Sequence, residues 1–172
     1  AAEVLGACLR AGVRLVQFRE KTGGSAEYYA RARLFRKKTR EAGALLIIND
    51  RVDIALAVEA DGVHLGREDL PLAAARRIAP DILLGASSHT PEEAREAEAA
   101  GADYINIGPI FQTQTKAVAT GAVGPAMIDR IAPDLKTKID IVQNAIDLAL
   151  SLGIAEPKVG VLSAVETVNP DL

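Results

Sequence analysis

The stretch that decides the fold is LLIINDRVDIALAVEADGVHL, residues 45–65. It opens on a continuous aliphatic run at residues 45–48, passes through an amphipathic segment at 53–60, and closes on a second aliphatic run at 62–65. Short continuous aliphatic runs are typical of strands that are buried on both faces of a parallel sheet. A strand, a helix and a second strand in so short a space predict a right-handed βαβ unit.

The same alternation continues on both sides of this stretch. Further strands are predicted at residues 13–18, 82–86, 104–107 and 159–162, and further helices at 26–42, 72–78 and 91–100. The pattern predicts an α/β fold of parallel (β/α) repeats of the TIM-barrel type. The runs amount to about six strands, which are few for a small closed barrel because strand number, tilt and shear are linked. We therefore expect an incomplete or rearranged barrel with an open sheet.

Length and composition favour one domain over residues 1–172, with 49% hydrophobic residues and a net charge of −3. No basic stripe is present, which argues against a nucleic-acid partner. No apolar run is long enough to cross a membrane, no signal peptide precedes the first helix, and the single cysteine fits a reducing compartment. We expect a cytoplasmic protein without membrane partners. An open sheet edge invites pairing with a second copy, so a homo-oligomer is a further expectation.

Polar residues gather directly after each predicted strand. They are Arg19-Glu20-Lys21, Asn49-Asp50-Arg51, Glu68-Asp69, Ser87-Ser88-His89, and the loop with Thr113, Thr115 and Lys116. In parallel β/α folds, the carboxyl ends of the strands share one face, and ligands bind there. The sequence therefore predicts a small-molecule site at a common rim.

Asp50 and Asp69 follow consecutive strands, so their carboxylates are expected to approach one site. Mg²⁺ prefers one or two carboxylates together with substrate phosphates and water, which makes the pair a candidate magnesium site. The alternative is that one or both aspartates cap the helices that follow them.

Cations and hydroxyls at the same rim suit an anionic ligand. Arg19 and Lys21 alternate just beyond the first strand, with Gln17 on the same side. Arginine offers a bidentate fork to phosphate and lysine a mobile charge; the alternative is a solvated turn. For His64, within a strand, and His89, before a helix, we expect structural roles.

These segments resemble the thiamine phosphate synthase family from Ala1 to about Ile131. The matching motifs are Gln17-Phe18-Arg19-Glu20-Lys21, Ile47-Ile48-Asn49-Asp50-Arg51-Val52-Asp53, Gly62-Val63-His64-Leu65-Gly66-Arg67-Glu68-Asp69-Leu70-Pro71, Ser87-Ser88-His89-Thr90, and Gly108-Pro109-Ile110-Phe111 with Thr113-Gln114-Thr115-Lys116. The related thiazole tautomerases share the barrel but usually lack the Gln-x-Arg-x-Lys run, so the synthase branch fits better.

The resemblance implies a TIM-barrel transferase that joins a hydroxymethylpyrimidine diphosphate to a thiazole phosphate and releases pyrophosphate. It implies Mg²⁺ at Asp50 and Asp69, catalytic roles for Ser87 and Lys116, and thiazole-phosphate contacts at Thr113 and Thr115. The pyrimidine-diphosphate contacts that it implies are Gln17, Arg19, Lys21, Asn49 and Lys116.

The chain also departs from the family pattern. A first strand before Ala1 and the Gly-Gly-Ile motif of the thiazole-phosphate site are missing, and residues 132–172 resemble a helix–strand unit of phosphate acetyl/butyryltransferases. We therefore expect a join near residue 131, from a natural fusion or an engineered chimera. The functional alternatives are an active thiamine phosphate synthase, a chimeric α/β fold that at most binds phosphate, and a catalytically inactive relative that acts as a ligand sensor.

Overall fold

The structure is a computed structural model that describes residues 2–108, 122, 124 and 126–131 of the chain. Its elements are α1 (Ala2–Arg10), β1 (Leu15–Phe18), α2 (Ser25–Glu41), β2 (Leu45–Asn49), α3 (Val52–Ala57), β3 (Gly62–Leu65), α4 (Leu72–Ile78), β4 (Leu83–Ser88), α5 (Pro91–Ala99), β5 (Tyr104–Ile107) and α6 (Ala126–Ile131). The sixth predicted strand, at 159–162, lies outside the described residues.

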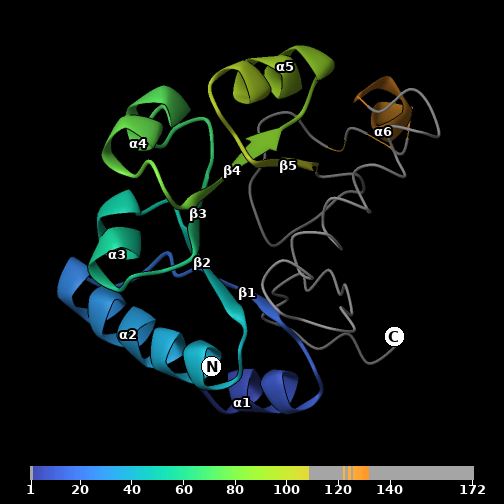
Figure 1. Cartoon of the computed structure of the whole chain (residues 1–172). Coiled ribbons are helices and arrows are strands. Elements are labelled where there is room, and N and C mark those ends of the chain that lie inside the picture. The colour runs from blue at the N-terminus through green and yellow to red at the C-terminus, as the bar shows by residue number, and fades with distance from the viewer. Residues whose placement is uncertain (1, 109–121, 123, 125, 132–172) are drawn as a thin grey trace.

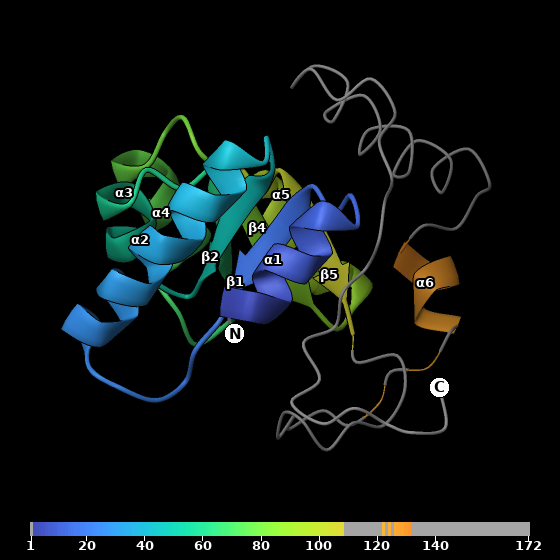
Figure 2. The same cartoon turned by 90° about the horizontal axis from the view of Figure 1, so that it is seen from below.

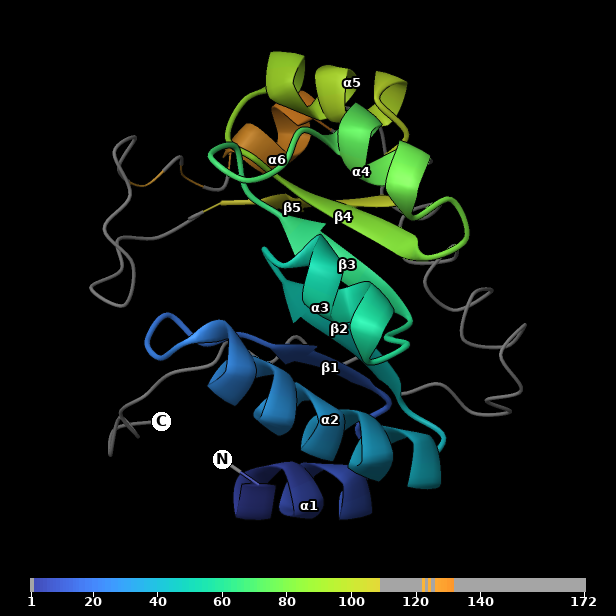
Figure 3. The same ribbon diagram turned by 90° about the vertical axis from the view of Figure 1, so that its left-hand side faces the viewer.

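The strands form one parallel sheet in the order β1-β2-β3-β4-β5, so each strand pairs with its successor along the chain. The sheet curls, and helices α2 to α5 lie on its outer side (Figures 1 and 3). This arrangement is an open half-barrel, and it confirms the predicted fold of parallel β/α repeats in an incomplete TIM-barrel arrangement.

Two strands extend further than the sequence predicts. Asn49 pairs with His64 and so belongs to β2. Ser87 and Ser88 pair with Asn106 and Ile107, which carries β4 to Ser88 where the aliphatic pattern ended at residue 86. The polar groups assigned to the loops after these strands are therefore held partly by backbone pairing within the sheet, which orients them more firmly than a loop would.

Paired residues on neighbouring strands point to the same face of the sheet. Alternate residues along each strand therefore form continuous rows across one face or the other. The outer face carries Phe18, Leu46, Ile48, Val63, Leu65 and Leu84, which pack against the helices in one buried cluster. The inner face carries residues of the opposite parity, among them Gln17, Asn49, His64, Ser87 and Tyr104. The outer face is thus packed against the helices, while the inner face combines these polar groups with aliphatic residues such as Ile47, which is 2% exposed.

The starts of β3 and β5 are built in the same way. Asp61 accepts hydrogen bonds from the Leu46 backbone N–H (2.7 Å) and from Arg36 on α2 (2.6 Å). Asp103 accepts from the Leu84 N–H (2.7 Å) and from Arg76 on α4 (2.7 Å). Each aspartate joins a helix to the sheet, at the edge opposite the carboxyl ends of the strands.

Helix α1 extends the outer layer beside α2 (Figure 3) and lies near β1 when the molecule is seen from below (Figure 2). Leu5 and Leu9 of α1 form a small buried cluster with Ala44, against Val16 and Phe35. In the described part of the chain, the helices are too short or too polar to cross a membrane.

Candidate active site

The site is assembled from the ends of β1, β2, β3 and β4. At the end of β1, Gln17 lies on the inner face, and Arg19 and Lys21 are exposed. The Lys21 Nζ donates a hydrogen bond to Asp50 Oδ2 at 2.9 Å, across from β1 to β2. Lys21, which was predicted to bind an anionic ligand, therefore contacts Asp50, which was predicted to bind a metal ion.

Asp50 has a left-handed backbone, with φ of 65°. This conformation is uncommon for residues other than glycine, but aspartate tolerates it better than most. The Asp50 N–H donates to the His64 carbonyl at 2.8 Å, so the chain stays tied to β3 while it turns away from β2.

Asp69 closes the turn after β3. Its Oδ2 accepts the Gly66 backbone N–H at 2.7 Å. Neither aspartate caps a helix, because the N-cap positions of α3 and α4 are Arg51 and Pro71, and neither has a side-chain cap hydrogen bond. The capping alternative is therefore wrong, and both carboxylates are available at the rim.

The two carboxyl groups influence each other. Burial raises the pKa of Asp50, but hydrogen bonds with Lys21 and Asp69 and the positive charges of Lys21 and Arg19 outweigh burial and leave this pKa below its ordinary value. Burial raises the pKa of Asp69, the Gly66 N–H opposes this, and the Asp50 carboxylate raises it further. The two carboxyl groups therefore shift each other's pKa in opposite directions, with Asp50 lowered and Asp69 raised.

This donor set fits a hard divalent cation. Two carboxyl groups from neighbouring strand ends supply the kind of oxygen ligands that Mg²⁺ takes from protein, and substrate phosphates and water complete its shell. Within the described residues, no cluster of three or more acidic, histidine or cysteine side chains forms a full protein cage. Asp50 and Asp69 suit a cation that arrives with a phosphorylated ligand.

Tyr28 ties the ends of β1 and β2 together from the outer side. Its hydroxyl lies 3.2 Å from the Phe18 carbonyl and 3.1 Å from the Asn49 carbonyl. Burial, followed by the charge of Asp50, raises the pKa of Tyr28 to about 12, so its hydroxyl stays protonated as a donor. Asn49 is itself buried at 7% exposure, which fixes its amide beside Asp50.

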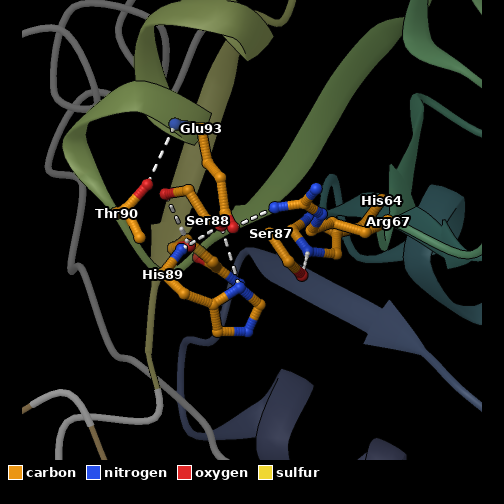
Figure 4. Close-up of polar contacts among 8 residues, drawn as sticks. His64, Arg67, Ser87, Ser88, His89, Thr90 and Glu93 are labelled. Carbon is orange, nitrogen blue, oxygen red and sulfur yellow. Dashed lines mark hydrogen bonds and ion pairs between the residues drawn. The ribbon is translucent and has the colours of Figure 1, made fainter. Parts of the chain in front are cut away.

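Ser87 lies on the inner face of β4 in contact with a histidine (Figure 4). Its Oγ is 3.0 Å from the Nε2 of His64, and the Nδ1 of His64 is 3.2 Å from the Tyr104 hydroxyl. His64 is 5% exposed, and the structural role that we expected for it stays a prediction. The sequence did not indicate its link to Ser87 and Tyr104, because that link depends on pairing across three strands.

A second group of contacts holds the loops above β3 and β4 (Figure 4). Glu93 accepts hydrogen bonds from the backbone N–H of His89 at 2.7 Å and from its Nδ1 at 3.0 Å, and forms an ion pair with Arg67. Thr90 caps α5 by accepting the Glu93 N–H. Glu93 therefore links the loop after β3, which carries Asp69, to His89, the first residue after β4.

A cavity of about 260 Å³ lies next to these loops, and both Asp69 and Ser87 line it. Gln17, Arg19, Lys21, Asn49, Asp50, Asp69 and Ser87 thus all lie at or just beyond the carboxyl ends of β1 to β4, and the Lys21–Asp50 contact joins two of these ends. Thr113, Thr115 and Lys116 lie outside the described residues.

A family model described as thiamine monophosphate synthase matches residues 1–156. The chain belongs to this family. The match includes the first part of the segment 132–172 and so gives no support to a join near residue 131.

Individual relatives in the thiamine monophosphate synthase family are close. A thiamine-phosphate synthase from Methanospirillum hungatei is 51% identical over 124 residues, which are 72% of this chain and 60% of the relative. A thiamine biosynthesis bifunctional protein, ThiM/ThiE, from Symbiobacterium thermophilum is 52% identical over 131 residues, 76% of this chain and 27% of the relative.

The fold of this family member is also found in a solved structure. The thiamine phosphate pyrophosphorylase from Pyrococcus furiosus superposes with a TM-score of 0.70 and 40% identity, covering 78% of this chain and 64% of that one. The chain thus spans less than two thirds of the length of each of these three relatives.

Proposed function

We propose that this chain is a thiamine phosphate synthase, which transfers the pyrimidine-methyl group of hydroxymethylpyrimidine diphosphate to a thiazole phosphate and releases pyrophosphate. The observation that carries this proposal is the cluster of Lys21, Asp50 and Asp69 at the shared rim. A basic and an acidic group from neighbouring strand ends are what a magnesium diphosphate needs for binding.

In this reaction the bond between the pyrimidine methylene carbon and the diphosphate oxygen breaks, and its electron pair leaves with pyrophosphate. The thiazole nitrogen then forms the new C–N bond with its lone pair. Because negative charge grows on the leaving group, donors and cations fixed around it stabilise the transition state. Mg²⁺ held by Asp50 and Asp69 would supply part of that positive charge.

The chain's own residues divide the remaining work. Arg19 and Lys21 hold the diphosphate, and the amides of Gln17 and Asn49 face the pyrimidine from the inner side of the sheet. Ser87 assists departure of pyrophosphate. From the family resemblance, Lys116 completes the diphosphate contacts, and Thr113 and Thr115 hold the thiazole phosphate.

The test is direct synthesis. The purified chain is incubated with both substrates and Mg²⁺, and thiamine phosphate and pyrophosphate are quantified in equal amounts as products. We expect formation of both, which chelation of Mg²⁺ abolishes. No thiamine phosphate above background would overturn the proposal, and binding of pyrophosphate without product would favour the alternative of an anion-binding α/β fold without activity.

The setting of this activity is also a proposal. Composition and the small phosphorylated substrates suit a cytoplasmic enzyme, and the open sheet suits a homo-oligomer. The acetyl/butyryltransferase-like origin of residues 132–172 stays a prediction.

A further inference from the structure

Three side chains on the inner face form a hydrogen-bonded chain across the sheet. Tyr104 on β5 contacts Nδ1 of His64 on β3 at 3.2 Å. Nε2 of His64 contacts Ser87 on β4 at 3.0 Å, and Figure 4 shows this second contact. We infer that Tyr104 and His64 position the Ser87 hydroxyl so that its proton points away from the imidazole and toward a ligand at the rim.

These hydrogen bonds can form because β4 has a glycine, with no side chain, between Tyr104 and His64. Gly85 lies between His64 and Tyr104 in the register of the sheet. A Cβ at Gly85 would overlap the Tyr104 ring and come within 2.5 Å of the His64 Nδ1. The missing side chain lets Tyr104 reach over β4 to a residue two strands away.

The direction of the hydrogen bonds follows from the chemistry of the groups. In a neutral imidazole one nitrogen donates and the other accepts. A phenol is a stronger donor and a weaker acceptor than an aliphatic alcohol, so Tyr104 donates to Nδ1. Burial, followed by the charge of Asp103, raises the pKa of Tyr104, which keeps the phenol protonated for this purpose. Nε2 then carries the imidazole proton and donates it to the Ser87 oxygen.

These hydrogen bonds run in the opposite direction to those around a nucleophilic serine. In a Ser-His-Asp triad the aspartate accepts from Nδ1, which leaves Nε2 free to remove the serine proton. Here the third group donates to Nδ1, so His64 cannot act as a base toward Ser87. Ser87 keeps its proton and becomes a directed hydrogen-bond donor, the property needed at an anionic leaving group. This last step rests on the proposed function.

The first readout is the tautomer of His64, measured by nitrogen-15 NMR of the protein without ligands. The chain has two histidines, so a His89→Gln variant assigns the signals. We expect the proton of His64 on Nε2, and a shift toward the Nδ1 form in Tyr104→Phe, which loses only the phenol donor. A wild-type His64 protonated on Nδ1, or on both nitrogens, would overturn the inference.

The second readout is the rate of thiamine phosphate formation. We expect Tyr104→Phe to lower kcat about 10-fold with little change in KM, which corresponds to about 1.4 kcal/mol of transition-state stabilisation. Because Tyr104 acts through Ser87, adding Tyr104→Phe to Ser87→Ala should cause no further loss. Tyr29→Phe is the matched control, since Tyr29 lies on α2 beside Arg33, on the outer layer.

The outcomes separate this inference from the proposed function. If Tyr104→Phe behaves like Tyr29→Phe, or if its effect adds fully to that of Ser87→Ala, the positioning role is wrong while synthesis stands. If wild-type protein makes no product, the proposed function fails, and the tautomer still decides whether Ser87 is held as a donor.

Discussion

Asp50 reaches the rim through a left-handed backbone (φ 65°) directly after β2. That single turn carries its carboxylate toward Lys21 on one side and Asp69 on the other. The residue therefore joins the predicted anion site to the predicted metal site, and its charge should matter more than that of any nearby surface carboxylate.

Replacing Asp50 with Asn should weaken the binding of pyrophosphate in the presence of Mg²⁺ by at least about 10-fold, because a hard cation loses one of its charged ligands. Asp53→Asn removes the same charge close by, but Asp53 is paired with Arg51 at 2.6 Å, so this control should bind as the wild type does. Titration calorimetry measures both, and equal losses in the two variants would contradict the role of Asp50.

Gly85→Ala should lower the free energy of unfolding by about 1–3 kcal/mol, because the added methyl group overpacks a filled space between Tyr104 and His64. Gly6→Ala in α1 meets only the flexible end of Arg10 at 3.3 Å, and should be neutral or stabilising. Urea unfolding compares the two variants. A Gly85→Ala protein as stable as wild type would show that the gap at β4 is not needed.

Sequence reasoning reached some of these residues and not others. Asp50 and Asp69 could be predicted to meet, because they follow consecutive parallel strands. The chain of Tyr104, His64 and Ser87 could not, since it depends on exact register and on an empty position at Gly85. The link made by Glu93 was also hidden, because its motif reads only as a helix start.

At the scale of elements, the aspartates at the starts of β3 and β5 are repeated joints between helix and sheet. The Arg36–Asp61 joint is the more enclosed, with the Arg36 side chain 14% exposed. Asp61→Ala should lower the free energy of unfolding by about 3 kcal/mol. The substitution removes the acceptor of the Leu46 N–H and leaves the largely buried guanidinium of Arg36 without its carboxylate partner.

The matched control for Asp61→Ala is Glu41→Ala. Glu41 forms an exposed pair with Lys37 at 4.0 Å, and exposed helix pairs contribute less than about 0.5 kcal/mol. Chemical denaturation gives both values, and similar costs for the two variants would mean that the joint contributes no more than a surface pair.

Glu93 gives α5 a pH-dependent attachment. Burial raises its pKa, but the hydrogen bonds from His89 and the charge of Arg67 outweigh burial and leave this pKa below the ordinary value of 4.5. A carboxyl group with a lowered pKa in the folded state stabilises the protein above its unfolded pKa, and loses this contribution as the pH falls through the folded value.

Glu93→Gln should therefore be less stable than the wild type at pH 7 by about 1.5–3 kcal/mol, the contribution of a hydrogen bond to a charged group. The difference should disappear as the pH is lowered below 4.5. Thermal unfolding of both proteins between pH 7 and pH values below 4.5 measures this difference in stability. A difference that stays constant with pH would contradict its assignment to the Glu93 charge.

The order of elements could be read from the sequence because buried strands, helical periodicity and glycine turns agree with one another. The end of β4 could not, since Ser87 and Ser88 have no aliphatic character and join the strand through pairing with β5. Polar residues at strand ends are held by the backbone of a neighbouring strand. The residues next to them in the sequence therefore do not show where the strand ends.

At the scale of the whole molecule, the half-barrel separates its two tasks by face. Apolar residues on the outer side hold the helices, and the inner side and the strand ends present polar groups. The same chain carries a second basic surface on α2, a hollow lined by Arg33, Arg36, Lys37 and Arg40. Arg36 and Arg40 are already paired with Asp61 and Glu59, so this surface should compete poorly for phosphate.

The central claim is that consecutive strand ends form one site for a cation and a diphosphate. A crystal structure of the protein with Mg²⁺ and pyrophosphate tests it most directly. We predict a cation bound by Asp50 and Asp69, with the pyrophosphate in contact with Arg19 and Lys21. Pyrophosphate bound instead in the α2 hollow, with no cation between the two aspartates, would contradict the account.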